Sequence, residues 1–288
     1  MTSPIQLSRE GRVALIRVDN PPVNALGHAV RAGLLDAFAQ AETDPGVELV
    51  MLYCAGKTFI AGADIREFGQ PPQAPILPEL TLAIESATKP SLAVLHGTAL
   101  GGGLEVALAC HYRIAQRDAR VGLPEVRLGL LPGAGGTQRL PRLTGVEKAL
   151  EMIVSGTPID SAEAQRCGIV DGLFDGDPLD AGLAFAARLL AGGAGPRRTG
   201  QIGIPAVDSS LFDTWRERIR REQPDAFAAL RCIAAVEAAA CLPLADGLRR
   251  ERALFLECMQ SPQREELVRR FFAEREAARA RRAARTTD

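Results

Sequence analysis

Between residues 91 and 105 the chain reads Ser91-Leu-Ala-Val-Leu-His-Gly-Thr-Ala-Leu-Gly-Gly-Gly-Leu-Glu105. The apolar run at residues 91–95 predicts a buried strand, and His96-Gly97 closes it with a turn. The three glycines then open a short helix, expected over residues 104–110. Glycine lets the backbone come close to a ligand, and the first turn of a helix has unpaired N–H groups. This stretch therefore favours a turn that can hold an oxyanion, although a tight turn without a ligand is the alternative.

Two glutamates beside glycine-rich backbone are the candidate catalytic groups. Glu105 lies among apolar residues, where a carboxylate must be solvated or paired. Glu125 follows Pro124 and precedes the glycine-rich segment 133–136. Each glutamate alone is more typical of a surface or ion-paired residue. If the two share one pocket, their repulsion raises one pKa and leaves an acid beside a base.

Composition limits the class of protein. The 288 residues are 47% hydrophobic and 24% charged, which is ordinary for a globular protein of one large domain, or of a domain with a helical appendage. A net charge of −1 gives no reason to expect nucleic acid or a membrane as a partner. No apolar stretch reaches the length of a membrane span, and the polar segment 1–11 lacks an apolar signal region. We therefore expect a cytoplasmic protein.

Motifs for metals, dinucleotides and serine hydrolases are missing from the sequence. The six cysteines have no CxxC spacing, and His28, His96 and His111 have no metal-ligand spacing. The glycine-rich segments lack the third glycine of a dinucleotide fingerprint, and there is no GxxxxGK[ST] or GxSxG motif. We therefore expect neither a metal nor a redox cofactor.

The first 195 residues alternate between strand and helix patterns, which predicts an α/β core. Strands are expected at residues 13–18, 49–54, 91–95, 112–115 and 120–123, and helices at residues 28–40 and 79–87. The prolines of residues 70–78 predict a loop. Two segments, 144–147 and 160–163, have the form of a capping box ahead of a helix.

The C-terminal third is predicted to be almost wholly helical. One helix is expected at residues 226–240, and Pro243 and Pro262 open two more. The glycine-rich segment 192–196 is the predicted linker. It divides the chain into a catalytic core, residues 1–195, and a helical region, residues 196–288, that packs on the core. The basic residues at 279–285 predict a solvated tail, with phosphate binding as the minor alternative.

Three motifs in this order resemble the crotonase, or enoyl-CoA hydratase/isomerase, superfamily. They are Phe59-Ile-Ala-Gly-Ala-Asp-Ile65, the segment 96–105 quoted above, and Pro124-Glu-Val-Arg-Leu-Gly-Leu-Leu-Pro-Gly-Ala-Gly-Gly-Thr-Gln-Arg-Leu140. The segments Asn24-Ala-Leu26 and Gly156-Thr-Pro-Ile-Asp160 also resemble the family pattern. The resemblance covers about residues 5–195. It implies a spiral of ββα repeats, followed by helices that close the active site or mediate trimerisation.

The resemblance also implies a site for acyl-CoA thioesters. By motif, the backbone N–H groups of Ala63 and Gly102 form the oxyanion hole, and Glu105 and Glu125 match the two hydratase glutamates. Glu125 is then the main proton donor to the α-carbon, and Glu105 positions and activates water. The residues expected to bind substrate and CoA are Ala61, Ala63, Asp64, Ile65, Arg66, Pro22 and Val23.

The implied activity is hydration of a 2-enoyl-CoA to a 3-hydroxyacyl-CoA, in fatty acid β-oxidation or related acyl-CoA catabolism. Two alternatives stay open: an isomerase that moves a 3-enoyl double bond to position 2, alone or as a second activity, and a non-catalytic acyl-CoA-binding module. The two glutamates favour the hydratase, because isomerisation needs fewer groups.

The C-terminal region carries a second resemblance. Glu251-Arg252-x-x-Phe255, Ser261 and Phe271-Phe-Ala-Glu-Arg275 resemble the segment that joins the hydratase half of multifunctional β-oxidation enzymes to their dehydrogenase half. The chain is then either a stand-alone hydratase or one half of such an enzyme. The resemblance implies a homotrimer or hexamer, or a monomer if the C-terminal helices cap the core.

Overall fold

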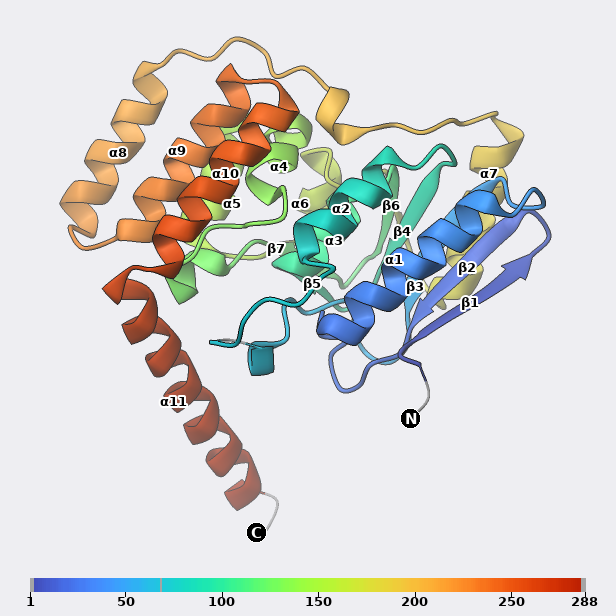
Figure 1. Ribbon diagram of the computed structural model, residues 1–288, viewed down its shortest axis with the longest axis horizontal. Helices are drawn as coiled ribbons and strands as arrows, with labels where there is room; N and C mark the ends of the chain where they lie inside the picture. The colour runs from blue at the N-terminus through green and yellow to red at the C-terminus, as the bar shows by residue number, and fades with distance from the viewer. Residues whose placement is uncertain (1–2, 68, 286–288) are drawn as a thin grey trace.

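A six-stranded sheet forms the centre of the computed structural model, which describes residues 3–67 and 69–285 (Figure 1). Its strands, in spatial order, are β1 (Ile5–Glu10), β2 (Val13–Val18), β3 (Leu49–Cys54), β4 (Ser91–Leu95), β6 (Tyr112–Gln116) and β9 (Gly172–Phe174). All pairs are parallel except β1 with β2. A second, smaller sheet contains β5 (Thr98–Leu100), β7 (Arg120–Gly122) and β8 (Ile159–Asp160).

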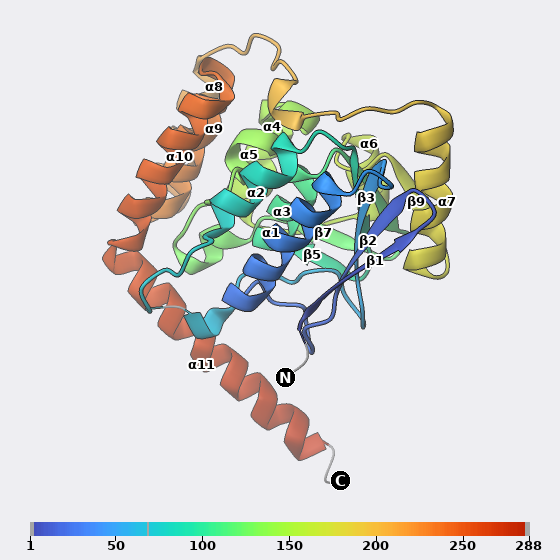
Figure 2. The same ribbon diagram turned by 45° about the vertical axis from the view of Figure 1, so that its right-hand side comes forward.

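Helices cover both faces of the large sheet, so its strands are apolar on both sides. On one face lies α7 (Pro178–Ala191), and on the other lie α1 (His28–Thr43), α2 (Leu77–Ser86) and α3 (Gly102–Ala109) (Figures 1 and 2). The strand residues that pack under α7 are Val13, Leu15, Leu49, Met51, Leu92 and Val94. Their neighbours face the main core: Ala14, Ile16, Val50, Leu52, Ala93 and Leu95. This alternation follows from the two-residue period of a strand.

The remaining helices extend the main core away from the sheet. They are α4 (Gly136–Thr144), α5 (Val146–Ser155), α6 (Ser161–Arg166), α8 (Ser210–Glu222), α9 (Phe227–Cys241), α10 (Leu244–Met259) and α11 (Pro262–Arg285). The alanine-rich α9 packs on α4 and α5, and α8 and α10 flank α9. Buried residues of α9, such as Ile233 and Val236, share one cluster with Leu140 and Leu150 of the first part of the chain. One hydrophobic core thus spans both parts of the chain. The predicted division into two regions at residue 195 stays a prediction.

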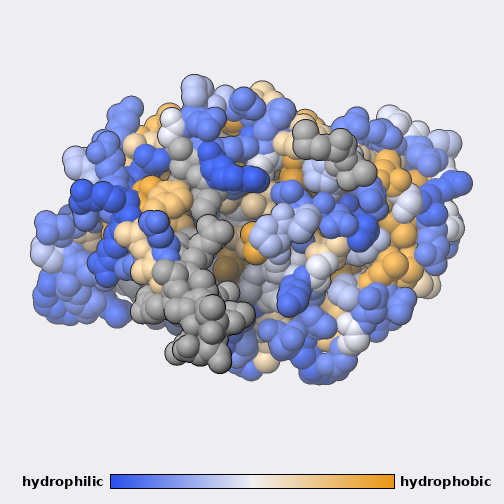
Figure 3. Space-filling view, turned by 90° about the horizontal axis from the view of Figure 1, so that it is seen from below, coloured by the Kyte–Doolittle hydropathy of each residue, from blue (hydrophilic) through white to orange (hydrophobic). Residues whose placement is uncertain are grey.

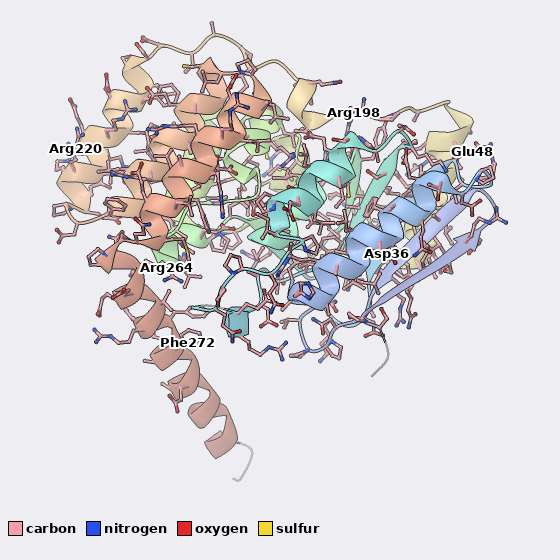
Figure 4. The ribbon with its side chains drawn as sticks, in the orientation of Figure 1. Asp36, Glu48, Arg198, Arg220, Arg264 and Phe272 are labelled. Atoms are coloured by element: carbon pink, nitrogen blue, oxygen red, sulfur yellow. The ribbon has the colours of Figure 1, made fainter. Side chains whose placement is uncertain are left out.

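Helix α11 starts on the body and then runs away from it (Figures 1 and 2). At its start lies Arg264 (Figure 4), and a Cβ added to Gly129 would lie 2.7 Å from the Cα of this residue, so the two backbones are in contact. Further along the helix, Phe272 is 40% exposed. The face seen from below is mostly hydrophilic, with hydrophobic residues scattered between (Figure 3). The predicted basic tail at residues 279–285 concerns side chains outside the described part.

The elements expected from the sequence are confirmed, with ends shifted by a few residues. The helix expected at residues 79–87 begins at Leu77, because Pro78 fits the first turn of a helix and is not part of the loop. The elements that were not predicted are β1, β5, β8, β9, α4 and α7. Three of these strands have only two or three residues, and β1 is a polar edge strand that buries Ile5 alone. Helix α7 has a readable start, since Asp177 caps it ahead of Pro178.

One of the two predicted capping boxes is wrong. The Asp160 side chain accepts a hydrogen bond from the Glu163 N–H at 2.8 Å, as a helix cap should. Thr144 caps nothing: it is the last residue of α4, and its hydroxyl donates to the Leu140 carbonyl at 3.1 Å. Gly145, at φ +79°, makes the corner into α5. Two helices joined by one glycine leave Thr144 inside the first helix and not before the second.

Candidate active site

The glycine triplet lies against the segment 60–63, at the carboxyl ends of β3 and β4. Gly101 adopts φ +53° and ψ −128°, a conformation that favours glycine, and its N–H donates to the Gly122 carbonyl at 2.9 Å. A Cβ on Gly103 would come within 2.0 Å of the Ile60 carbonyl oxygen. Only glycine allows this approach, and it places Gly102 beside Ala63: a Cβ on Gly102 would lie 3.9 Å from the Ala63 nitrogen.

The backbone N–H groups of Gly102 and Ala63 are both placed to meet a ligand. Gly102 is the first residue of α3, so its N–H precedes the helical hydrogen bonds. Ala63 forms a parallel bridge with Leu26, whose N–H donates to the Gly62 carbonyl. In this parallel pattern Leu26 makes the hydrogen bonds on both sides of Ala63. The N–H of Ala63 itself therefore points away from Leu26. The structure thus brings the two predicted oxyanion-hole residues together.

Glu105 is buried in α3 and is held by the start of α4. Its Oε1 accepts hydrogen bonds from the N–H groups of Ala134 at 2.7 Å and Gly136 at 2.9 Å. Burial is the largest effect and leaves the pKa of Glu105 above its usual value, while these two bonds and the Arg139 charge act against the rise. The two N–H groups favour the ionised form of this carboxylate.

Glu125 has a different environment. It begins η2 (Glu125–Leu128), and its Oε2 is buried with no hydrogen-bond partner among the described residues. A Cβ on Gly101 would lie 2.9 Å from its Oε1, so the carboxyl group sits over the glycine turn. Burial first, and then the charges of Glu105 and Glu251, raise the pKa of Glu125 well above its usual range. The structure therefore places a carboxyl group whose charged form is disfavoured near one that two N–H groups hold.

The segments expected to bind CoA also come together. The Ala61 N–H donates to the Val23 carbonyl at 3.2 Å, which places the loop of Pro22 and Val23 beside the segment 61–66. The guanidinium of Arg66 bonds both carboxylate oxygens of Asp64, at 2.9 and 2.6 Å, and lowers the pKa of Asp64.

The two residues of this ion pair differ in exposure. Asp64 is buried, whereas the Arg66 side chain is 80% exposed and is the group free to meet a ligand. Ile65 begins η1 (Ile65–Glu67), with its side chain outside the described part.

Sequence reasoning missed Arg31, which anchors the proline-rich loop near the site. Its guanidinium bonds the Pro75 carbonyl at 2.8 Å and the Glu67 carboxylate at 2.7 Å. The loop delivers Leu77, whose Cδ2 would be 2.7 Å from a Cβ on Gly102. A signal existed, because Arg31 stands on the apolar face of the helix expected at residues 28–40.

A third buried glutamate, Glu251 of α10, was not predicted at the site. Its Oε1 accepts from the Gly135 N–H at 2.7 Å, and its Oε2 accepts from the N–H and hydroxyl of Thr137 at 3.1 and 2.5 Å. The residue is 2% exposed. Because Glu251 stands more than a hundred positions from these partners, no local pattern could have linked them.

The described residues contain no cluster of three or more His, Cys, Asp and Glu side chains that could hold a metal. Within the same residues, no helix combines the length and the apolar character needed to cross a membrane.

Comparison with known proteins now identifies the family. The family described as enoyl-CoA hydratase/isomerase matches residues 8–194. The chain belongs to the crotonase family. Its α/β sheets followed by an all-helical region are the crotonase fold, as solved for carnitinyl-CoA hydratase from Mycobacterium avium, which is 31% identical with a TM-score of 0.70. That match covers 96% of this chain and 97% of the other.

Two relatives give the scale of the similarity. The peroxisomal bifunctional enzyme of Danio rerio is 42% identical over 267 residues, which cover 92% of this chain and 37% of that protein. The chain thus spans little more than a third of this relative. A probable enoyl-CoA hydratase of Bacillus subtilis (strain 168) is 47% identical over 173 residues, which cover 58% of this crotonase-family chain and 67% of the relative.

Proposed function

We propose that this crotonase-family chain adds water to 2-enoyl-CoA thioesters, giving 3-hydroxyacyl-CoA in fatty acid β-oxidation or related acyl-CoA catabolism. The observation that carries the proposal is a pair of buried glutamates in different surroundings. Glu105 is held by two N–H groups that favour its ionised form, whereas burial and repulsion raise the pKa of Glu125 and favour its protonated form. Hydration needs a base and an acid in the same site, and this pair provides both.

The reaction follows from these positions. Glu105 takes a proton from water as the water oxygen bonds to carbon 3. The electrons of the double bond move toward the thioester, whose oxygen gains negative charge between the N–H groups of Ala63 and Gly102. Glu125 gives its proton to carbon 2, which completes the addition of water. Removal of one such N–H donor costs about 3–4 kcal/mol in comparable sites.

The binding of CoA is proposed on the segments that surround this centre. Arg66 is exposed and positively charged, so it can meet a CoA phosphate, and Asp64 orients its guanidinium. The backbone of Ala61, Ala63 and Ile65, with the loop of Pro22 and Val23, forms the adjacent surface.

The isomerase remains the second candidate. It needs one group to move a proton between carbons 4 and 2, so the pair of glutamates is more than it requires. The names of two relatives support hydration, since they are described as a probable enoyl-CoA hydratase and a carnitinyl-CoA hydratase. A purely binding role would need neither an ionised nor a protonated carboxyl group at the glycine turn.

Mixing the protein with crotonyl-CoA tests the proposal. We expect the absorbance of the conjugated thioester to fall, and mass spectrometry to find a product heavier by one water. An isomerase instead raises this absorbance when given a 3-enoyl-CoA. Binding measured by calorimetry, without turnover of either substrate, would contradict the enzyme and favour the binding module.

The Gly102→Pro variant tests the oxyanion hole. Proline is tolerated at the first position of a helix, but it deletes the N–H. We expect kcat/KM to fall by about 100-fold or more, with circular dichroism unchanged. Gly102→Pro and its control, Gly102→Ala, are both made in a Leu77→Ala background, because a Cβ at position 102 would lie 2.7 Å from Leu77 Cδ2. The control keeps the N–H. A folded Gly102→Pro protein with normal turnover would remove Gly102 from the mechanism.

The proposed reaction uses no metal or redox cofactor. The cytoplasmic location and the oligomeric state stay predictions from the sequence.

A further inference from the structure

The start of α4 holds two carboxylates and not one. Four successive backbone N–H groups alternate between them: those of Ala134 and Gly136 donate to Glu105, and those of Gly135 and Thr137 donate to Glu251. Glu105 belongs to α3, whereas Glu251 comes from α10, outside the family match at residues 8–194. The C-terminal helices therefore reach the backbone that holds the proposed base.

Packing alone is a poor reason for a glutamate at position 251. Glu105 and Glu251 are each only 2% exposed, and burying one carboxylate beside another destabilises a protein. Burial, and then the charge of Glu105, raise the pKa of Glu251 to about 8, while Thr137, Gly135 and Arg139 act against this. An apolar side chain could hold α10 on α4 without this cost.

The segment that binds both carboxylates is intrinsically flexible. It contains Gly133, Gly135 and Gly136, and Gly135 adopts φ +94°. Glycine loses more conformational freedom on folding than other residues, so such a segment needs bonds that fix each peptide plane. Glu251 fixes the planes that carry the N–H groups of Gly135 and Thr137. The peptide plane between these two carries the N–H group of Gly136. Together with the N–H group of Ala134, it holds Glu105.

We propose that Glu251 is a positioning residue for the proposed hydration. By fixing the start of α4 from the side of the C-terminal helices, it keeps the N–H groups of Ala134 and Gly136 on Glu105 Oε1. Glu105 is thereby held in the orientation that activates water. This role rests on the proposed function.

The positioning role predicts the direction in which the titration of Glu105 moves. Three ionisable groups face Glu251: Glu105 from α3, Arg139 from α4 and Glu125 from η2. Because the pKa of Glu251 is raised to about 8, Glu251 is protonated at acid pH, and a glutamine there removes no charge. Misplacing the N–H groups of Ala134 and Gly136, which lower the pKa of Glu105, therefore raises that pKa.

The full chain carrying Glu251→Gln tests the role. The glutamine oxygen can accept from one of the two N–H groups, but its NH₂ group faces the other. We expect kcat for crotonyl-CoA to fall by about tenfold or more, with KM within about threefold, because the base is misaligned while the CoA site is intact. The acid limb of the kcat–pH profile should move to higher pH, because Glu105 loses part of the N–H bonding that lowers its pKa.

Two further variants keep the test decisive. Glu257→Gln is the matched control on α10, where that carboxylate is 41% exposed and pairs with Arg231, and it should change nothing. Thr137→Val removes only the hydroxyl bond to Glu251 and should lower kcat by a smaller factor in a protein that folds. A normal kcat and pH profile in Glu251→Gln, or in Thr137→Val if the first variant does not fold, would overturn the positioning role.

An activity-independent readout separates this inference from the proposed function. In wild type and Glu251→Gln labelled with ¹³C at glutamate carboxyls, the pKa of Glu105 is measured directly by NMR. A wild type that does not hydrate crotonyl-CoA refutes the proposed function. A Glu105 pKa that is unchanged in Glu251→Gln refutes the positioning role, whatever the activity.

Discussion

Replacing Glu125 by glutamine lowers the kcat of crotonyl-CoA hydration by about 100- to 10,000-fold and leaves KM within a few-fold. Glutamine keeps the shape of the side chain but carries no proton that carbon 2 can take, and general acid catalysis is worth this range. Steady-state kinetics at neutral pH measure the effect. Glu105→Gln should be similarly inactive, because it removes the group that takes the proton from water.

The same variant should be more stable than the wild type at alkaline pH. The folded-state pKa of Glu125 lies well above the usual value of 4.5, so the folded protein keeps a proton that the unfolded chain releases as pH rises. Stability therefore falls between 4.5 and the raised pKa, and glutamine escapes this loss. Each kcal/mol regained raises Tm by about 2–4 °C. Melting curves at about pH 8 should show the gain, and those at about pH 4 should show almost none.

A surface glutamate provides the control for both measurements. Glu151 of α5 is 61% exposed and pairs with Lys148, so Glu151→Gln should keep activity and show no pH-dependent gain in Tm. A Glu125→Gln protein with near-normal turnover would exclude Glu125 as the acid. A variant that is less stable than the wild type at about pH 8 would contradict the raised pKa.

The sequence allows the fold and both glutamates to be predicted, because these depend on local patterns and three long motifs. It does not give the environments that make the glutamates different. The N–H groups of residues 134 and 136 turn toward Glu105 and favour its ionised form, whereas burial and the neighbouring carboxylates raise the pKa of Glu125, whose Oε2 has no hydrogen-bond partner in the described chain. Neither fact follows from the identity of the neighbouring residues.

Contacts between distant segments set the limit of what could be predicted. The approach of Gly103 to Ile60 explains why the glycine triplet exists, but only three-dimensional packing shows which backbone it meets. Glu251 belongs to a motif that resembles a segment of multifunctional enzymes, but the motif predicts no role for it. Its partners Gly135 and Thr137 lie in another part of the chain. The shortest strands were missed because two or three residues have no measurable period.

Removing residues 196–288 should leave a fragment that is insoluble or inactive. The cut uncovers the faces of α4 and α5 on which α9 packs, and so opens the core cluster that contains Leu150 and Ile153. Each large apolar side chain left in water costs about 1.5–3 kcal/mol, and a domain has only about 5–15 kcal/mol to lose. The fragment also loses the bonds of Glu251 to Gly135 and Thr137, and the Phe255 ring that packs on Gly133.

Expression of residues 1–195, followed by size-exclusion chromatography, circular dichroism and the crotonyl-CoA assay, measures the outcome. A chain that ends at residue 274 is the matched control, because it keeps α8, α9, α10 and the part of α11 that contacts η2. We expect this control to fold and to retain activity. The two truncations together decide whether the C-terminal helices complete the site. A stable, fully active 1–195 fragment would show that they are an independent appendage, and it would also rule out Glu251 as a support for Glu105.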